Sequence, residues 1–180
     1  MTCNASVFIA TSLDGFIARP DGELDWLPAM DPRNDMGYGD FVSTVDVLVM
    51  GRHTFEKVLS FGRWPYHMPV RVLSRSGVEI PAELENVALM SGSPRALLDA
   101  LGTEGFQHAY IDGGETIQAF IADGLVQRLI LTRIPVLIGD GLPLFGKLKA
   151  NAGDQLWFHE KTFTWANGVV QSHYRFSQSG

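Results

Sequence analysis

The residues with the clearest chemical pattern follow the apolar run 45–49. Such a run is typical of a buried strand, and the residues after it are typical of a helix start: Gly51, Arg52, His53 and Thr54. A glycine at this junction lets the backbone approach a ligand closely, and the free N–H groups of a new helix attract an anion. Arginine adds charged donors and threonine adds a hydroxyl. The pattern predicts a phosphate or pyrophosphate site, and the alternative is an ordinary strand-to-helix turn.

A second polar pair, Ser74 and Arg75, follows the apolar run 70–73, and Arg75 stands 24 residues beyond Gly51. In sheets that bind dinucleotides, the residue at the end of the second strand commonly contacts the adenosine ribose. An acid there suits NAD, whereas arginine or serine suits the 2′-phosphate of NADP. The pair therefore favours NADP(H), although Arg75 could also be a solvated turn residue.

A third strand-to-helix junction follows the strand expected at 107–111. It consists of Asp112, Gly113, Gly114, Glu115 and Thr116. Ligands of open α/β sheets bind at the carboxyl ends of the strands. We therefore expect this junction to complete the nucleotide site begun by the other two.

The elements that would position these residues alternate along the chain. A loop rich in Asp, Pro and Gly, with short helical pieces, is expected over 21–40, and a two-residue turn, Asn167-Gly168, indicates a terminal hairpin. Strands are expected at 5–11, 45–50, 70–74, 107–111, 127–134, 156–163 and 169–176, and helices at 53–60, from Ser93 onward, and at 115–123. This order predicts a mixed α/β sheet with an antiparallel edge.

Length and composition limit the classes of protein that the chain could belong to. Its 180 residues show no repeat and no internal linker, so we expect one domain over 1–180. A net charge of −6 without basic clusters argues against a nucleic-acid partner. The single Cys3 fits a reducing compartment, and neither a signal peptide nor an apolar stretch of membrane-spanning length is recognisable. A cytoplasmic protein with no membrane partner is expected.

Taken together, the motifs resemble those of a known family. The matching segments are 12–18, 50–54, 73–75, 112–116, 131–135 and 139–145. They occur in this order in the dihydrofolate reductase fold, and more narrowly the chain resembles the reductase family represented by the C-terminal domain of the riboflavin-pathway bifunctional deaminase–reductase. The resemblance implies a three-layer fold, in which a twisted, mostly parallel sheet is flanked by helices, and a homodimer.

The same resemblance implies an NADPH-dependent reductase that transfers a hydride to a small heterocyclic or ribosylamino substrate, as 5-amino-6-(5-phosphoribosylamino)uracil reductases do. It implies that Ala10 and Ile17 border the nicotinamide and that residues 51–54 hold the pyrophosphate. The other implied cofactor contacts are Leu73, Ser74, Arg75, Asp112, Gly113, Gly114, Glu115 and Thr116. Two alternatives stay open: a dihydrofolate or pterin reductase, and a non-catalytic NADP(H)-binding module.

The chain departs from the family pattern at the substrate. Riboflavin-pathway reductases typically carry lysine where Phe16 stands, which weakens the case for a ribose-phosphate substrate. Dihydrofolate reductases place one carboxylate on the helix after the first loop. Here Asp35 and Asp40 occupy the corresponding region without a clean motif. The identity of the substrate is therefore left open.

Five further residues are candidates for contacts with the substrate. Asp14 would orient the substrate or relay a proton beside the nicotinamide, or would only cap its turn. Asp40 would contact substrate or cap a helix. Trp26 and Tyr38, together with Trp64, offer flat aromatic surfaces for a heterocycle, and ordinary packing is the alternative.

Two other motifs fail on inspection. Residues 141–148 approach the phosphate-loop pattern, but Leu148 replaces the Ser or Thr that binds Mg²⁺, and Pro143 lacks an N–H. We expect 139–146 to be a loop that closes over the sheet. The histidines show no H-E-x-x-H motif and the chain has no paired cysteines, so no metal site is expected.

Overall fold

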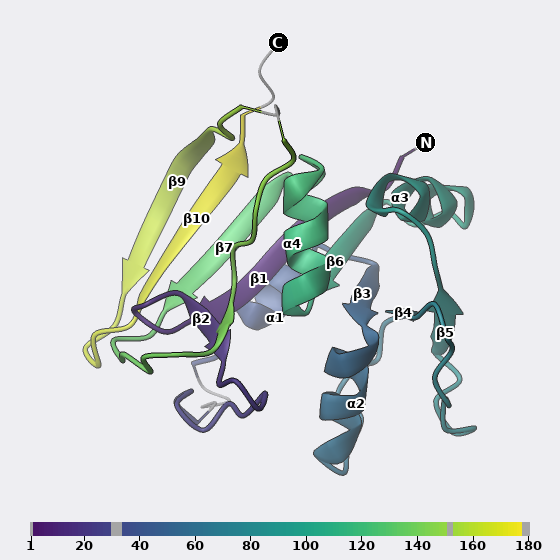
Figure 1. Cartoon of the computed structure of the whole chain (residues 1–180), viewed down its shortest axis with the longest axis horizontal. Coiled ribbons are helices and arrows are strands. Elements are labelled where there is room, and N and C mark those ends of the chain that lie inside the picture. Colours follow the sequence, from purple (N-terminus) through teal and green to yellow (C-terminus); the bar gives the residue numbers. More distant parts are fainter. Residues whose placement is uncertain (1, 30–33, 151–152, 178–180) are drawn as a thin grey trace.

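The computed structural model describes residues 2–29, 34–150 and 153–177 (Figure 1). The expected loop at 21–40 therefore has residues 30–33 outside the described part. The strands are β1 (Asn4–Thr11), β2 (Phe16–Ala18), β3 (Val47–Gly51), β4 (Val70–Leu73), β5 (Val87–Met90), β6 (His108–Asp112), β7 (Arg128–Arg133), β8 (Leu142–Pro143), β9 (Trp157–Thr164) and β10 (Val170–Phe176). The helices are α1 (Tyr38–Val42), α2 (Arg52–Ser60), α3 (Pro94–Thr103) and α4 (Gly114–Ala122).

One large sheet organises the chain. Its eight strands lie in the order β5-β4-β3-β6-β1-β7-β10-β9. The first six are mutually parallel, whereas β10 runs antiparallel to both β7 and β9. The carboxyl ends of six strands therefore meet at one edge, where ligands of open α/β sheets bind.

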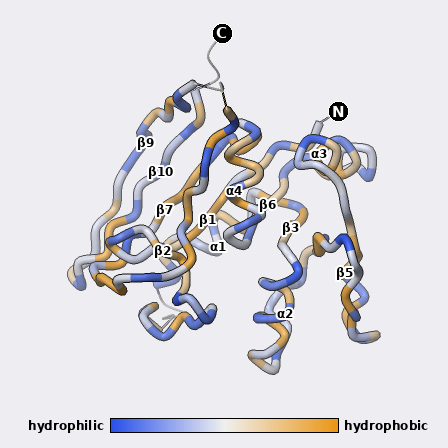
Figure 2. The backbone as a smooth tube through the Cα atoms, viewed as in Figure 1, coloured by the Kyte–Doolittle hydropathy of each residue, from blue (hydrophilic) through white to orange (hydrophobic). Residues whose placement is uncertain are grey.

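Helices cover both faces of the sheet (Figure 1). One hydrophobic cluster lies on each face. On one face, α3 and α4 contribute Leu97, Leu101 and Phe120. On the other, α1 and α2 contribute Phe41 and Phe55. The strands in the middle of the sheet carry much of the hydrophobic colour in Figure 2, whereas β9 and β10 are more polar. The expected three-layer fold with an antiparallel C-terminal hairpin is confirmed.

Strand alternation determines which residues face each cluster. In β6, Ala109 and Ile111 belong to the cluster under α3 and α4, and Tyr110 belongs to the cluster under α1 and α2. Because successive side chains of a strand point to opposite faces, Asp112 lies on the same face as Tyr110. The last residue of β6 therefore faces the layer that contains α1 and α2.

The structure has three strands that the sequence did not predict. β5 is short and mostly half-buried at the edge of the sheet. β2 and β8 form a separate two-stranded sheet in which Phe16 pairs with Pro143 and Ala18 with Leu142. The segment 139–146 was expected to be only a loop, but it contains β8. A local sequence pattern could not predict this strand, because its partner β2 lies more than a hundred residues away.

Candidate functional site

Two strand-to-helix junctions meet at the carboxyl edge of the sheet. Gly51 caps α2, Gly113 caps α4, and their parent strands β3 and β6 are neighbours. A Cβ placed on Gly51 would lie 3.0 Å from Oγ1 of Thr116. A Cβ on Gly113 would collide with Oγ1 of Thr54 and lie 3.7 Å from the backbone nitrogen of Gly51. The structure thus gathers these four residues into one crowded cradle.

The cradle suits a diphosphate. Neither Gly51 nor Gly113 caps its helix with a side chain, so the first N–H groups of α2 and α4 have no side-chain acceptor at the cap. Two helix N-termini that converge in this way favour a negative group between them. Because neither glycine has a Cβ, the backbone of Gly51 and Gly113 can approach a ligand closely. These residues fit the pyrophosphate of a dinucleotide.

Arg52 connects the cradle to the turn after β4. Its Nε lies 2.7 Å from Oε1 of Glu56, and its Nη1 donates to Oγ of Ser76 at 3.4 Å. The hydroxyl of Ser74 donates to the carbonyl of Gly77 at 3.0 Å, which uses its only proton inside the turn. Arg75 and Ser76 are exposed and remain available to a ligand. Sequence reasoning missed Ser76 because only the three-dimensional contact with Arg52 distinguishes it.

Three further cofactor candidates occupy different surroundings. His53 is 85% exposed and lies 3.6 Å from Glu56, so its contacts point along α2. Leu73 is partly buried against the cluster under α3 and α4. Glu115 is exposed in the first turn of α4. The structure places all three at the same edge of the sheet as the cradle.

The residues expected near the nicotinamide lie in β1 and β2. Ala10 is half-buried and pairs in register with Thr132 of β7. Ile17 packs closely on the start of α4, since a Cβ on Gly114 would lie 2.7 Å from its Cδ1. β2 therefore contacts the first residue of α4, directly beside the cradle.

Asp14 joins two loops. Its carboxylate accepts hydrogen bonds from the backbone N–H groups of Ile138, at 3.3 Å, and Gly139, at 2.8 Å. The hydroxyl of Ser12 and these two N–H groups lower the pKa of the Asp14 carboxyl. A carboxylate held ionised in this way is a poor proton donor. Its geometry favours the alternative that Asp14 shapes the loop after β1.

Asp112 has the opposite electrostatic character. One carboxylate oxygen accepts from the backbone N–H of Gly113 at 2.8 Å. The residue is half-buried, but its carboxyl group lies among densely packed atoms, and this burial raises its pKa to about 6. A buried carboxyl group with a raised pKa beside a ligand cradle is a candidate acid–base group. The sequence analysis assigned Asp112 to the cofactor because burial cannot be read from the motif.

The negative charge of Asp112 acts on three buried or half-buried tyrosines. Burial and the negative charge of Asp112 raise the pKa of Tyr38 to about 12 and also raise the pKa values of Tyr66 and Tyr110. The Tyr110 hydroxyl donates to the carbonyl of Phe8 at 3.1 Å. All three phenols therefore stay protonated and can donate hydrogen bonds. Tyr66 was missed because Trp64-Pro65-Tyr66 belongs to no regular pattern.

Tyr38 and Tyr66 line one cavity on this face of the sheet. Its volume is about 250 Å³, and the other lining residues are Val42, Val45, Pro65, His67 and Met68. Two phenol rings with aliphatic neighbours provide a surface that suits a planar ring carrying polar edges. The charge of Asp112 acts on both phenols of this cavity, which makes it the candidate substrate pocket.

The two candidate tryptophans each bury their ring N–H group. Within the ranges that the structure describes, Nε1 of Trp26 and Nε1 of Trp64 have no hydrogen-bond acceptor. The ring of Trp64 packs edge-on against Tyr66, with centroids 5.1 Å apart, and against Phe55 at 5.6 Å. Trp64 thus supports the pocket wall, and no described contact joins Trp26 to that wall.

Asp40 is separate from this group. It is exposed in the first turn of α1, and its described contact is the bond from the Ser43 hydroxyl to its backbone carbonyl. The carboxylate of Asp35, by contrast, accepts from the N–H groups of Gly37 and Gly39 at 2.9 and 2.7 Å. The helix-start role considered for Asp40 is therefore performed by Asp35.

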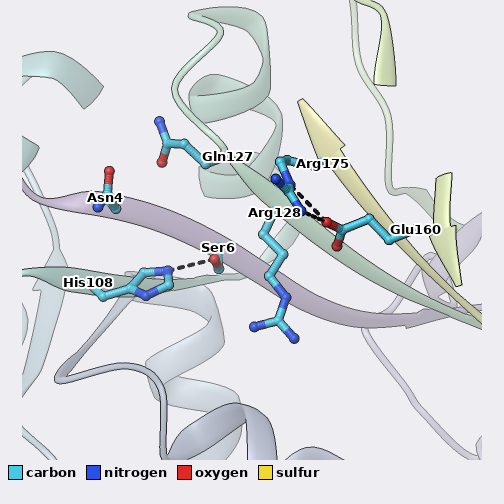
Figure 3. Close-up of a pocket in the computed structure, with 7 residues that line it drawn as sticks. All are labelled: Asn4, Ser6, His108, Gln127, Arg128, Glu160 and Arg175. Atoms are coloured by element: carbon cyan, nitrogen blue, oxygen red, sulfur yellow. Dashed lines mark hydrogen bonds and ion pairs between the residues drawn. The ribbon is translucent and has the colours of Figure 1, made fainter. Parts of the chain in front are cut away.

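A larger cavity, of about 420 Å³, lies at the opposite edge of the sheet (Figure 3). Its lining residues include Asn4, Ser6 and His108, at the amino ends of β1 and β6. Its polar groups largely satisfy one another: Oγ of Ser6 lies 2.7 Å from Nε2 of His108, and Arg175 pairs with Glu160. This cavity does not include the glycine cradle or Asp112.

The described residues contain neither a metal site nor a membrane-spanning helix. No group of three or more His, Cys, Asp or Glu side chains in this part of the chain is arranged to hold a metal ion. None of its helices combines the length and the apolar character needed to cross a bilayer.

Comparison with known proteins identifies the family. The sequence profile described as the RibD C-terminal domain matches residues 5–170. The uncharacterized protein YwjB of Bacillus subtilis (strain 168) is 37% identical over 145 residues, which cover 79% of this chain and 82% of YwjB. A crystal structure from Shewanella sp. PV-4, provisionally described as a riboflavin biosynthesis protein, is 41% identical with a TM-score of 0.89, covering 99% of this chain and 100% of that one.

More distant structures share the fold. RibD of Acinetobacter baumannii superposes with a TM-score of 0.76 at 16% identity, and the match covers 98% of this chain but 58% of the RibD chain. The likeness at this identity concerns the fold alone. The profile match spans most of the sequence, and the chain belongs to the RibD C-terminal domain family.

Proposed function

We propose that the protein is an NADPH-dependent reductase that acts on a small heterocyclic or ribosylamino substrate of the riboflavin-pathway type. The observation that carries the proposal is the meeting of Gly51 and Gly113 at two helix N-termini, with the raised-pKa carboxyl group of Asp112 immediately before Gly113. The family and the riboflavin-related description of the Shewanella protein support the substrate class.

In this proposal the cradle holds the pyrophosphate and the turn after β4 holds the adenosine end. Arg75 and Ser76 are exposed there, and Arg52 reaches Ser76 from α2. Arginine and hydroxyl donors suit a 2′-phosphate, which distinguishes NADPH from NADH. The residues present therefore fit the phosphorylated cofactor.

The reaction needs a hydride and a proton. NADPH, when bound, supplies the hydride from its nicotinamide. With a pKa of about 6, Asp112 still carries a proton in a fraction of the molecules near neutral pH, and it can give that proton to the substrate. Tyr38 and Tyr66 donate hydrogen bonds that orient the substrate in the pocket. Asp112 and the two tyrosines thus replace Asp14 and Asp40 as our proposed substrate-side groups.

A substrate screen tests the proposed activity. NADPH oxidation would be followed with 5-amino-6-(5-phosphoribosylamino)uracil and with dihydrofolate, and the product identified by mass spectrometry. We expect turnover with the pyrimidine. Turnover only with dihydrofolate would assign the protein to the pterin type instead. Binding of NADPH that is not oxidised with either substrate would support a non-catalytic NADP(H)-binding module.

Arg75→Glu tests the choice of cofactor. We expect NADPH affinity to fall by about 10-fold or more, since a carboxylate would face the 2′-phosphate, while NADH affinity changes by less than about 2-fold. Fluorescence titration measures both dissociation constants. Lys161→Glu, on β9 at the far side of the sheet, makes the same charge change and should leave both constants unchanged. Equal losses for the two cofactors in Arg75→Glu would contradict the assignment.

We also propose a homodimer. β9 forms one edge of the sheet, and all of its residues after Trp157 are exposed. Phe158 and Phe163 are 64% and 45% exposed on it. An exposed edge strand with large apolar side chains favours pairing with another chain. Sedimentation equilibrium of the intact protein would show a dimer, and a monomer at all concentrations would contradict this proposal.

A further inference from the structure

Gln171 fastens the segment before α1 to the sheet. It lies in β10 and is 2% exposed. Its Nε2 donates to the carbonyl of Met36 at 3.0 Å and to Oγ1 of Thr132 at 2.9 Å, and its Oε1 lies 3.0 Å from Nε2 of His173. Since the Gln171 oxygen only accepts, His173 carries its proton on Nε2. The amide therefore uses both its donors and its acceptor inside the protein.

We call the hydrogen bonds of Gln171 to Met36, Thr132 and His173 a clamp. This clamp is insensitive to pH around neutrality. Burial, with further contributions from the nearby charges of Lys161 and Arg128, lowers the pKa of His173 to about 4, and Glu160 opposes this shift. His173 is therefore neutral in the range where the protein would work. The bond to Gln171 then has one fixed arrangement of donor and acceptor.

The segment that Gln171 restrains, from Met36 into α1, has little conformational stability of its own. Met36 has a φ of 54°, the only positive φ at a non-glycine residue in the described ranges. It precedes the five-residue helix α1, which begins at Tyr38 and is far shorter than helices that are stable alone. A strained backbone persists only where its surroundings hold it in place. The bond from Gln171 to the Met36 carbonyl is such a restraint, two residues before Tyr38.

Asn86 plays the corresponding part for Tyr66. Its Nδ2 donates to the carbonyl of Tyr66 at 3.1 Å and to that of Met68 at 2.7 Å. Its own carbonyl accepts from the N–H of Val70 at 2.8 Å, so the residue is anchored at the start of β4 and β5. The segment between α2 and β4 contains no helix or strand. Asn86 therefore supplies the hydrogen bonds that regular structure would otherwise supply to Tyr66.

We infer that Gln171 and Asn86 are positioning residues, which set Tyr38 and Tyr66 as a pair in the wall of the candidate substrate pocket. Both tyrosines line the same 250 Å³ cavity, which neither amide lines. Gln171 reaches its segment from β10 and Asn86 from the residue before β5, and each acts through backbone carbonyls rather than on the substrate. Together they fix the width of the pocket. The inference rests on the proposed function, because it assigns that pocket to the substrate.

Hydrogen exchange tests the clamps independently of activity. Gln171→Met and Asn86→Leu keep side-chain size and remove the hydrogen bonds. We expect Gln171→Met to speed exchange in 34–42 but not in 64–68, and Asn86→Leu to do the reverse. Gln155→Met is the matched control, since Gln155 also donates to a backbone carbonyl, that of Ile121 at 2.6 Å, and it should alter neither segment.

Kinetics on the same variants test the link to catalysis. With 5-amino-6-(5-phosphoribosylamino)uracil, we expect each clamp variant to raise KM by about 10-fold or more, since small displacements of orienting groups are costly, while the NADPH dissociation constant stays within about 2-fold. Gln171→Glu, which keeps the shape, replaces Gln171→Met if the latter does not fold.

The outcomes separate the two proposals. Unchanged exchange in the clamp variants, or faster exchange throughout the chain, would overturn the positioning role. Localised exchange with unchanged KM would also overturn it, because the segments would then not control the substrate. The expected exchange pattern in a protein whose wild type oxidises no NADPH would retain the clamps and reject the proposed function.

Discussion

Asp112→Asn is expected to lower kcat/KM by about 100-fold or more, because positioned general acids contribute roughly 10²–10⁴ to enzymatic rates. The amide keeps the size of the side chain but has no proton to give. The loss should appear in kcat as well as in kcat/KM, since the proton is needed only as the transition state forms. Steady-state kinetics with the pyrimidine substrate measures it. The wild-type kcat/KM should itself fall as pH rises above about 6, the pKa of Asp112.

The same substitution should stabilise the fold at neutral pH. The pKa of Asp112 is about 6 in the folded protein and 3.8 as an unperturbed group, so the folded state binds this proton more tightly. Its contribution to stability is therefore complete below pH about 4 and is lost as pH rises to about 6. Two pKa units correspond to roughly 3 kcal/mol, an order-of-magnitude figure. Asp112→Asn removes this loss, and urea unfolding at about pH 4 and about pH 7.5 would measure the change.

Asp140→Asn is the matched control for both effects. The carboxylate of Asp140 accepts from the N–H of the following Gly141 at 2.8 Å, as Asp112 does from Gly113, but Asp140 is exposed. We expect it to change neither kcat nor the pH dependence of unfolding. An Asp112→Asn variant with wild-type turnover would remove Asp112 from the reaction.

Gly113→Ala is expected to be the second severe change. Gly113 has a φ of 90°, which side-chain-bearing residues rarely adopt, and its new Cβ would collide with Oγ1 of Thr54. We expect the free energy of unfolding to fall by roughly 1–3 kcal/mol from the backbone alone. NADPH affinity should fall by about 10-fold or more, because the methyl group would displace the cradle against the pyrophosphate. Chemical unfolding and fluorescence titration measure the two effects.

Two companion variants separate backbone strain from crowding. Gly62 has a φ of 77°, and a Cβ there would meet nothing within 4 Å. Gly62→Ala should therefore cost stability without weakening NADPH binding. Adding Thr54→Ala to Gly113→Ala removes the hydroxyl in the way, and the two changes should couple favourably in a double-mutant cycle. Independent effects of the two substitutions would show that the junctions do not touch.

The sequence predicted the cofactor-side elements well because their signals are local. An apolar run, a glycine and a helix start lie within a few residues of one another at Gly51 and again at Gly113. That the two junctions meet required only the rule that parallel strands share an edge. The register of β3 on β6 then brings Thr54 against Gly113.

The substrate side was less predictable because its chemistry depends on burial and distant contacts. Asp14 and Asp112 both follow a strand, yet the Ser12 hydroxyl and backbone N–H groups lower the pKa of Asp14, whereas burial raises the pKa of Asp112. Gln171 contacts Met36 across 135 residues of sequence. No local sequence pattern indicates such a contact, and neither Gln171 nor Asn86 belongs to a motif.

Thermal unfolding of the intact protein with NADPH, with NADH and with neither tests the central claim most directly. NADPH at 100 times its dissociation constant should stabilise the protein by about 2.7 kcal/mol, which raises the midpoint by roughly 5–10 °C for a chain of this size. NADH at the same concentration should shift it much less, because Arg75 and Ser76 would find no 2′-phosphate. Equal midpoints in all three samples would contradict the cofactor site and the reductase built on it.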